Sequence, residues 1–304
     1  MTIPGLSLRS GPRDCESRTS TESYDIRRRT EVQAFSAWTP PSGTLGRIVD
    51  EARVRARALE SRIAELEERA KNGASVPAFA SALRGTTVSV IAEVKRRSPS
   101  KGWIQPSLNA ATQARAYASA GAKAISVLTE PQHFAGSSDD LVDVRSAVSI
   151  PVLKKDFHVE EVQLLEAKSI GASAALLIVR ALGPARLPVM TRAANELSLE
   201  VLVEVRDERE LDLALETGAQ VIGINNRDLE TLAIDPNTSA RLLGRVPPTV
   251  VAVAESGVSA RADVERVAQA GADAVLVGSS VSSAADPSDA VRGLTGVRRI
   301  ARGD

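Results

Sequence analysis

The sequence predicts an α/β protein in which eight parallel strands alternate with helices and close into a (β/α)8 barrel. Eight short apolar runs recur between residues 88 and 278, and each is followed by a polar or glycine-containing turn and a helical stretch. A Gly-Ala turn precedes every second run. The eight runs fit within about 190 residues, which is close to the lower end of what such a barrel needs.

The first 43 residues differ from the rest of the chain. They are rich in Ser, Thr, Arg and Pro, have no sustained apolar period and end near the break Pro40-Pro41. A segment of this composition buries too little apolar surface to fold, so we expect residues 1–43 to form a disordered extension. Residues 44–304 are expected to form one barrel domain, which includes N-terminal helices over about residues 44–72.

These N-terminal helices are predicted by an apolar stripe at helical spacing. Its members follow one another at intervals typical of one helix face, at Leu45, Ile48, Ala52, Leu59, Ile63 and Leu66. Charged residues occupy the other faces, and Gly73 supplies a stop. The stripe predicts helical turns packed against the barrel. A coiled-coil partner helix is the alternative, but the stripe is short and rich in alanine for it.

The eight apolar runs predict strands that are buried on both faces. They lie at residues 88–94, 124–128, 150–154, 174–179, 199–205, 220–225, 249–254 and 274–278. Strands of a parallel sheet covered by helices are nearly continuous apolar runs, whereas half-exposed strands alternate. The runs therefore indicate a parallel sheet with helices outside it.

The glycine turns give a second period, one βαβα unit long. They precede strands two, four, six and eight, at Ala120-Gly121-Ala122, Ile170-Gly171-Ala172, Thr217-Gly218-Ala219 and Ala270-Gly271-Ala272. Glycine ends the helix, and the small alanine lets the chain turn tightly into the strand. A doubly wound open sheet is the alternative. It seldom needs eight even units, and no G-x-G-x-x-G follows the first strand.

Composition excludes several classes of function. Lys plus Arg equals Asp plus Glu at 38 each, so no overall field favours nucleic acid or acidic membranes. Cys15 is the sole cysteine, which excludes a disulfide framework and a cysteine zinc cluster. No apolar run approaches the ~18 residues of a membrane helix, and the N-terminus lacks a signal-peptide core. We expect a cytoplasmic protein with no metal site, no membrane contact and no nucleic-acid partner.

Polar side chains occur where the apolar strands end. In VIAEVKRRSPSKG, residues 90–102, Glu93 and Lys95 share one face because side chains two apart point the same way. Later strands end in charged or amide side chains, at Lys155, Glu204, Asn225 and Arg227. Charges that face a barrel interior are unfavourable unless they are paired or bind a ligand. Any one of them is explained equally well by a structural ion pair, but their convergence at the C-terminal rim predicts an active site.

The last two strands are followed by small residues. Glu255-Ser256-Gly257 ends strand seven, and Gly278-Ser279 ends strand eight. Backbone N–H groups beside glycine can approach an anion closely, and the loops after strands seven and eight commonly hold phosphate in such barrels. A tight turn alone would also explain the glycines. Their occurrence beside serine after both strands predicts a phosphate site.

With these residues assembled, the chain resembles the indole-3-glycerol-phosphate synthase family of tryptophan biosynthesis. The resemblance covers about residues 44–297 and rests on seven motifs in family order: IAEVKRRSPSKG, SVLTEPQHFAGS, PVLKKDF, LVEV, IGINNRDLETL, VAESGV and LVGSS. It implies a TIM barrel of the ribulose-phosphate-binding type with an N-terminal helical extension.

The resemblance also implies a carboxy-lyase reaction. The substrate, 1-(2-carboxyphenylamino)-1-deoxyribulose 5-phosphate, would close its ring and lose CO2 and water to give indole-3-glycerol phosphate, without a metal or organic cofactor. Such steps require general acids and a base. By resemblance, Lys155 is the general acid in ring closure, Glu204 the general base, and Lys95 a second acid and substrate anchor. The remaining catalytic positions are Glu93, Asn225 and Glu255.

Substrate contacts are carried over from the same motifs. The implied substrate-binding residues are Ser98, Phe134, Phe157, Arg227, Leu229 and Ser256. The implied phosphate-binding residues are Ser256, Gly257, Gly278 and Ser279. Phe134, Phe157 and Leu229 would wall the anthranilate ring.

Two other functions remain as alternatives. A catalytically retired homologue could serve as a binding or scaffold protein, but the charges at Lys95, Lys155 and Glu204 are intact. Phosphoribosylanthranilate isomerase, another barrel of the same pathway, uses a cysteine and an aspartate at strand ends, whereas Cys15 lies far outside the predicted barrel. The expected partner is a small phosphorylated substrate. A monomer is expected, with a dimer as the alternative.

Overall fold

Eight parallel strands form a closed ring in the structure, a computed structural model that describes residues 38–303. β1 (Ser89–Val94) closes the ring, because it pairs with both β4 (Ala124–Leu128) and β10 (Ala274–Val277). The strands between them are β5 (Val152–Lys155), β6 (Ala174–Ile178), β7 (Glu200–Val205), β8 (Val221–Asn225) and β9 (Val251–Glu255). Each of the eight predicted runs forms one of these strands, with ends shifted by at most two residues. The predicted barrel is confirmed.

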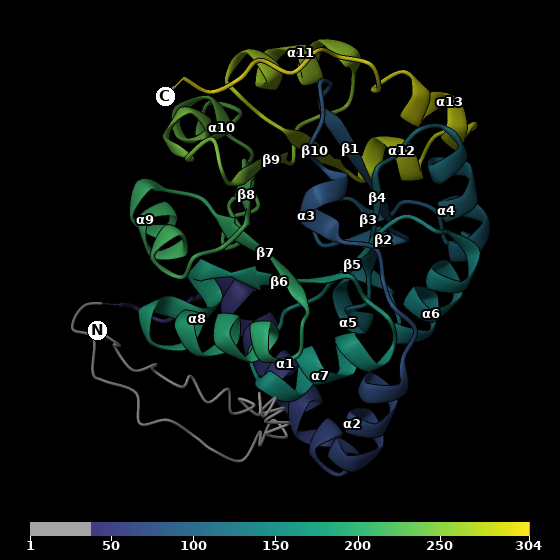
Figure 1. The fold of residues 1–304 in the computed structure, drawn as a ribbon, viewed down its shortest axis with the longest axis vertical. Helices are drawn as coiled ribbons and strands as arrows, with labels where there is room; N and C mark the ends of the chain where they lie inside the picture. The colour runs from purple at the N-terminus through teal and green to yellow at the C-terminus, as the bar shows by residue number, and fades with distance from the viewer. Residues whose placement is uncertain (1–37, 304) are drawn as a thin grey trace, which may run out of the picture.

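Helices surround the ring of strands (Figure 1). They are α4 (Ala110–Ser119), α6 (Ser138–Ala147), α7 (Glu161–Ser169), α8 (Val179–Glu196), α9 (Glu208–Glu216), α10 (Asn237–Leu242) with the 3-10 turn η1 (Leu243–Arg245), α11 (Arg261–Gln269) and α13 (Pro287–Arg292). Gly121 and Gly271 lie in turns that lead back to strands, with φ of 101° and 97°, which L side chains rarely adopt. Among residues 38–303, no helix has both the length and the apolar character required to cross a membrane.

Five short elements lie outside this repeat. β2 (Arg97–Ser98) and β3 (Gly102–Trp103) form an antiparallel hairpin in the loop after β1. α5 (Pro131–Phe134) follows β4, and α12 (Ser279–Ser282) follows β10, both at the C-terminal ends of strands. α3 (Phe79–Ala82) precedes β1. The loops after β1, β4 and β10 thus carry extra structure at the end where the active site is predicted.

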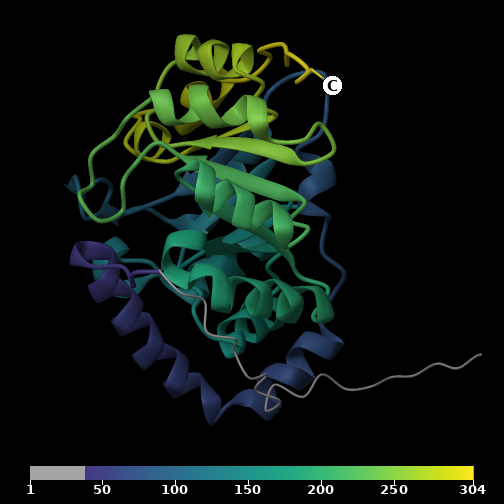
Figure 2. The ribbon, with the colours of Figure 1, turned by 90° about the vertical axis from the view of Figure 1, so that its left-hand side faces the viewer.

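Two helices precede the barrel and run along its outside (Figure 2). α1 (Gly43–Glu60) buries Leu45, Ile48 and Ala52, as the apolar stripe predicted. The expected helical stretch breaks at Ser61, and α2 (Ile63–Asn72) then packs Leu66 against α7. Residues 1–37, most of the predicted extension, lie outside the described residues.

Residues 38–42 contact the N-terminal turns of α8 and α9. The guanidinium groups of Arg180 and Arg209 lie 5.5 and 5.3 Å from the ring centroid of Trp38. Arg180 also donates to the carbonyl of Thr39 at 2.7 Å. A side chain at Gly183 would come within 2.7 Å of the Trp38 ring, so glycine leaves room for the indole.

The C-terminal segment packs against the opposite end of the barrel from the predicted site. Asp273, just before β10, is buried and accepts hydrogen bonds from the N–H of Ala252 at 2.8 Å and from Arg299 at 2.5 Å. Arg302 contacts the same carboxylate at 2.8 Å and donates to the carbonyl of Val250. One buried carboxylate therefore joins the C-terminal segment to β9 and β10.

Replacing Asp273 by Ala is expected to destabilise the fold strongly. It would leave the buried Arg302 charge without its carboxylate, and breaking such a pair costs about 3–5 kcal/mol. Denaturant unfolding monitored by circular dichroism measures the loss. Asp289→Ala is the matched control, because its pair with Arg292 is exposed and such pairs contribute at most about 1 kcal/mol. Equal losses in the two variants would contradict the role given to Asp273.

Candidate active site

A cavity of about 330 Å³ opens at the C-terminal ends of the strands. It brings together all but one of the predicted site residues: Glu93, Lys95, Phe134, Lys155, Phe157, Glu204, Asn225, Arg227, Leu229, Glu255, Ser256, Gly257, Gly278 and Ser279. The strand register explains this convergence, because Glu204 lies beside Gly223 and Asn225 lies beside Glu255 in adjacent strands. Glu93 and Ser279, which are 186 positions apart in the sequence, thus line the same cavity.

Lys155 lies between two carboxylates inside the cavity. Its Nζ is 3.5 Å from Glu204 Oε2 and 3.7 Å from Glu255 Oε2. Burial acts to lower the pKa of Lys155, but the charges of Glu204, Glu255 and Glu93 outweigh it and hold that pKa above its ordinary value. The side chain is therefore an ammonium at neutral pH and can serve as a proton donor.

The neighbouring lysine faces the other way. Lys154 points out of the barrel, where it is 3.0 Å from Glu166 of α7 and 3.5 Å from Asp156. Strand alternation separates the two lysines, so one contributes to the cavity and the other to the packing of helix against sheet.

Asn225 orients the carboxylate of Glu204. Its Nδ2 donates to Glu204 Oε1 at 2.9 Å, while its Oδ1 accepts the N–H of Arg227 at 2.9 Å. Arg227 in turn donates to the carbonyl of Leu232 at 2.9 Å. Glu204 is 3% exposed and lines the cavity. Asn225 contacts one of its carboxylate oxygens, and Lys155 contacts the other.

Glu93 and Lys95 form a second charge pair at the end of β1. Lys95 Nζ lies 2.5 Å from Glu93 Oε1. A side chain at Gly278 would collide with this Glu93 oxygen and come within 2.7 Å of Lys95 Nζ. Gly278 was predicted from its place in a phosphate loop, and the structure gives it a further role because only glycine leaves room for the pair.

Glu255 is the least compensated carboxylate in the cavity. Its Oε1 is buried without a hydrogen-bond partner among the described residues, and it lies directly over Gly223 of β8. Burial raises the pKa of Glu255 well above its ordinary range; Lys155 opposes this shift, and Glu204 and Glu93 add to it. Burial thus favours the protonated form of Glu255.

The predicted phosphate loops lie together at one end of the cavity. Ser256 and Gly257 both have positive φ, 62° and 80°, so the chain turns sharply after β9. Ser279 lines the same cavity, as does Ser280, whose Oγ is buried without a partner in residues 38–303. Sharp turns of this kind can expose successive backbone N–H groups to an anion.

Ser98 is the one predicted residue outside the main cavity. It lines a smaller adjoining pocket of about 70 Å³, together with Lys95, Phe134 and Ser279. Its Oγ accepts the N–H of Lys101 at 3.2 Å, so the hydroxyl holds the turn of the loop after β1.

The aromatic wall is anchored to α1. Phe134 and Phe157 lie with ring centroids 6.3 Å apart. Arg55 of α1 reaches Glu130, which precedes Phe134, at 3.3 Å, and Asp156, which precedes Phe157, at 2.8 Å. One guanidinium thus bridges the two loops that carry the wall.

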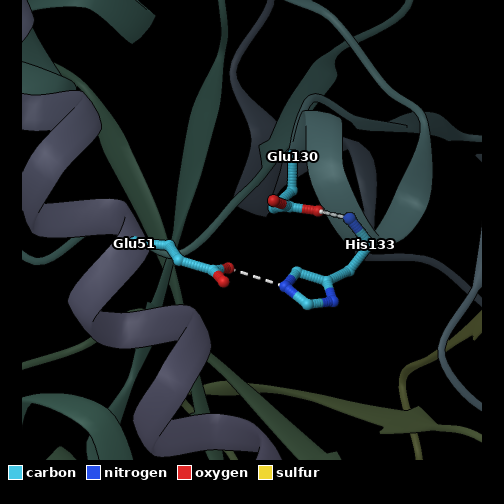
Figure 3. Close-up of side chains that lie close together, drawn as sticks. All are labelled: Glu51, Glu130 and His133. Carbon is cyan, nitrogen blue, oxygen red and sulfur yellow. Dashed lines mark hydrogen bonds and ion pairs between the residues drawn. The ribbon is translucent and has the colours of Figure 1, made fainter.

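Glu51, Glu130 and His133 form a further cluster between α1 and α5 (Figure 3). His133 Nε2 and Glu51 Oε2 are 2.6 Å apart. The oxygens of Glu130 already accept three N–H groups at the start of α5 as well as the Arg55 guanidinium. A carboxylate with this many donors, beside a cation, is a helix cap and not a metal ligand.

Sequence reasoning missed several residues that line the cavity. They include Lys101, Leu128, Leu176, Ile178, Ile234, Val258, Ser259 and Leu276. Lys101 had a signal, since it is a base in the glycine-containing loop after β1. The apolar residues had none, because they are indistinguishable from core residues until the ring closes.

Comparison with known proteins decides the family. The sequence profile of the family described as indole-3-glycerol phosphate synthase matches residues 45–294. This chain belongs to the indole-3-glycerol phosphate synthase family. Indole-3-glycerol phosphate synthase 2 of Streptomyces coelicolor is 49% identical over 262 residues, which cover 84% of this chain and 100% of that protein. Indole-3-glycerol phosphate synthase of Mycolicibacterium vanbaalenii is 46% identical, over 82% of this chain and 93% of its own length.

A solved structure supports the fold alone. Thiamine phosphate pyrophosphorylase from Pyrococcus furiosus superposes with a TM-score of 0.53 at 17% identity, over 68% of this chain and 93% of its own. The indole-3-glycerol phosphate synthase family thus places its motifs on a barrel shared with an enzyme of very different sequence.

Gly223→Ala is expected to displace the Glu255 carboxylate, because the added methyl collides with Oε1 and comes within 2.7 Å of Leu202 Cδ2. Misplacing a group that faces the reacting atoms costs about 100-fold in rate. The measurement is the rate of indole-3-glycerol phosphate formation. Gly244→Ala is the control, since a methyl there meets nothing within 4 Å. Unchanged turnover in Gly223→Ala would show that the reaction does not require the Glu255 carboxylate in its position over Gly223.

Arg55→Met is expected to weaken substrate binding more than turnover, because it frees the loops that carry Phe134 and Phe157. It also leaves Glu130 without its cation, which costs about 3 kcal/mol. Steady-state KM and kcat, with denaturant unfolding, test both effects. Arg53→Met is the control, since within residues 38–303 the only ion pair of Arg53 is with the exposed Asp50. A fall in stability with an unchanged KM would limit Arg55 to a structural role.

Proposed function

We propose that this chain is an indole-3-glycerol-phosphate synthase that converts 1-(2-carboxyphenylamino)-1-deoxyribulose 5-phosphate into indole-3-glycerol phosphate, CO2 and water. The observation that carries the proposal is the placement of an ammonium, Lys155, 3.5 Å from Glu204 and 3.7 Å from Glu255 in one cavity. Family membership supports the same reaction.

Ring closure is the first step. The aromatic carbon that carries the carboxylate attacks the C2′ carbonyl, a C–C bond forms, and the carbonyl oxygen takes a proton from Lys155. The C–CO2 bond then breaks, and its electron pair restores the aromatic ring as CO2 leaves. A preorganised ammonium is well suited to the first event, because negative charge develops on the oxygen next to it.

Dehydration completes the product. Glu204 removes the proton from C1′, and the hydroxyl leaves C2′ with a proton from Lys95, so that a C=C bond forms and water departs. Glu204 suits the role of base because Asn225 fixes its orientation at 2.9 Å. The lysines serve as acids in separate steps, and the sequence of steps requires no cofactor.

The remaining residues support substrate binding in this proposal. Phe134, Phe157 and Leu229 line the pocket for the anthranilate ring, and Arg227 braces the carboxylates of the active site. Ser98 stabilises the turn of the loop after β1, beside Phe134. The phosphate is held by Ser256, Gly257, Gly278 and Ser279.

A retired binding protein is the weaker alternative. Three carboxylates and two lysines in one cavity carry a desolvation penalty even when they are paired, and a protein that no longer transferred protons would not need to keep them, which supports retention for catalysis. The isomerase alternative is not supported, since none of the residues that line this cavity is a cysteine.

We further propose that the protein acts in the cytoplasm on a small phosphorylated substrate, as a monomer and without a nucleic-acid partner. Residues 44–304 would form a single domain. The balanced charge and the single cysteine support these assignments.

Lys155→Ala is expected to lower kcat by at least about 100-fold, the usual contribution of a general acid. Indole fluorescence follows product formation in real time. Glu204→Gln keeps the size of the side chain and should bind substrate with a similar KM while turning over at least about 100-fold more slowly. A rate for Lys155→Ala within tenfold of wild type, about 1.4 kcal/mol of barrier, would remove Lys155 from the mechanism.

A further inference from the structure

A second cavity lies beside the active-site cavity, among the loops that follow β6, β7 and β8. Its volume is about 180 Å³. It shares five lining residues with the active-site cavity: Ile178, Glu204, Asn225, Arg227 and Leu229. Its other walls include Arg206 and Asp228, whose side chains are 39% and 25% exposed. The cavity therefore extends from the buried Glu204 carboxylate toward solvent.

Glu210 lines this side cavity from the first turn of α9. It is 4% exposed, and its Oε2 accepts the N–H of Arg206 at 2.8 Å. Its own N–H donates to Asp207 Oδ1 at 2.8 Å. The hydrogen bond from the Arg206 N–H requires only one oxygen of the Glu210 carboxyl group, and both the protonated and the ionised form supply it. The position of Glu210 is thus fixed while its proton is free to exchange.

Charges from three loops act on Glu210. Burial, helped by the carboxylates of Asp207 and Glu204, raises the pKa of Glu210 to about 7, although the Arg206 N–H and the charge of Arg180 act in the opposite direction. The other charged residues of the cavity are Arg206, Arg227, Asp228 and Glu230. Two ion pairs partly neutralise this wall: Arg206–Asp228 at 3.5 Å and Arg180–Glu230 at 2.6 Å. Near neutral pH, both the protonated and the ionised form of Glu210 are therefore accessible.

The proposed reaction requires a proton from solvent. The substrate carboxylate leaves as neutral CO2 and the hydroxyl leaves as water, so one proton is taken up per turnover. Lys155 and Lys95 each give one proton and Glu204 receives one, which leaves the three groups one proton short. The side cavity reaches Glu204 from the loops after β6, β7 and β8, and neither the two phenylalanines nor the predicted phosphate-binding residues line it.

We propose that the side cavity is a proton inlet and that Glu210 is its relay residue. Glu210 passes its proton through cavity water to Glu204, which passes it to the neutral Lys155 amine across 3.5 Å. Lys155 is then an ammonium again, Glu204 is again a carboxylate ready for the dehydration step, and Glu210 regains a proton from solvent. The proton that Glu204 then takes from C1′ replaces the one that Lys95 gives to the leaving hydroxyl, so all the groups return to their starting state. The inference rests on the proposed function.

The test is Glu210→Gln. Glutamine keeps the oxygen that accepts the Arg206 N–H but cannot carry an exchangeable acid proton. At about pH 6, kcat should fall by roughly tenfold, less than the ~100-fold for a group that acts on substrate directly. Above about pH 8 the variant should approach wild type, because Glu210 is already ionised there and delivers nothing. KM should be unchanged throughout.

The pH profile separates a relay from a purely electrostatic role. Glutamine mimics the protonated, uncharged side chain, so an electrostatic role would leave the low-pH rates equal and change the high-pH rates. That opposite pattern, or superimposable profiles, would overturn the relay. Glu210→Asp keeps an acid and should recover part of the low-pH rate; recovery no better than glutamine's would also overturn it.

Asp263→Asn is the matched control. Asp263 caps α11 in the same way, accepting the N–H groups of Ser259 and Ala260, and it lies outside both cavities. Its variant should lose stability without any change in the shape of the pH profile. Wild-type protein that fails to form indole-3-glycerol phosphate would refute the proposed function, whereas an active wild type with an unaltered Glu210→Gln profile would refute the relay alone.

Discussion

Mutual compensation of buried charges is the constraint on which the site depends. Three carboxylates, Glu93, Glu204 and Glu255, enter one closed ring, and each is within reach of Lys95 or Lys155. Charges removed from water are tolerated only in such geometry. Lys155 ends β5, whereas its partners Glu204 and Glu255 lie on β7 and β9, so this part of the cluster exists only when the barrel is closed and in register. Fold and site therefore require one another.

The same rule shapes the layer outside the strands. Lys154, Asp156, Glu166 and Arg55 form a chain of charges that joins α1 and α7 to the end of β5. Where Lys155 faces the cavity, its neighbour Lys154 binds the supporting helices. A single Lys-Lys-Asp segment thus connects the inner charge cluster to the helices that hold it in place.

Periodicity and the strand-end rule predicted the strands and most of the cavity, since both depend on local spacing and on the topology of parallel barrels. They could not predict what depends on contact between distant segments. Gly223 and Gly278 leave space for the carboxylates of Glu255 and Glu93, and this role is visible only when neighbouring strands are aligned. Arg55 and Glu210 resemble ordinary charged residues on helices, and only packing shows that one bridges two loops and the other borders a cavity. Ser98 matched a family motif, but its hydroxyl holds a turn outside the main cavity.

The two lysines are not equivalent, and their distances explain why. Lys95 is held to Glu93 at 2.5 Å, whereas Lys155 lies 3.5 and 3.7 Å from its two carboxylates. Coulomb attraction is shared over three acids at Lys155, but directional hydrogen bonding at these distances is weak. Its N–H groups are therefore available to an incoming oxygen while its charge stays stabilised. A donor with a raised pKa gives up its proton only to a strongly basic acceptor, and the oxygen that becomes an alkoxide during ring closure is such an acceptor. The cluster thus protects Lys155 from losing its proton before the carbon–carbon bond begins to form.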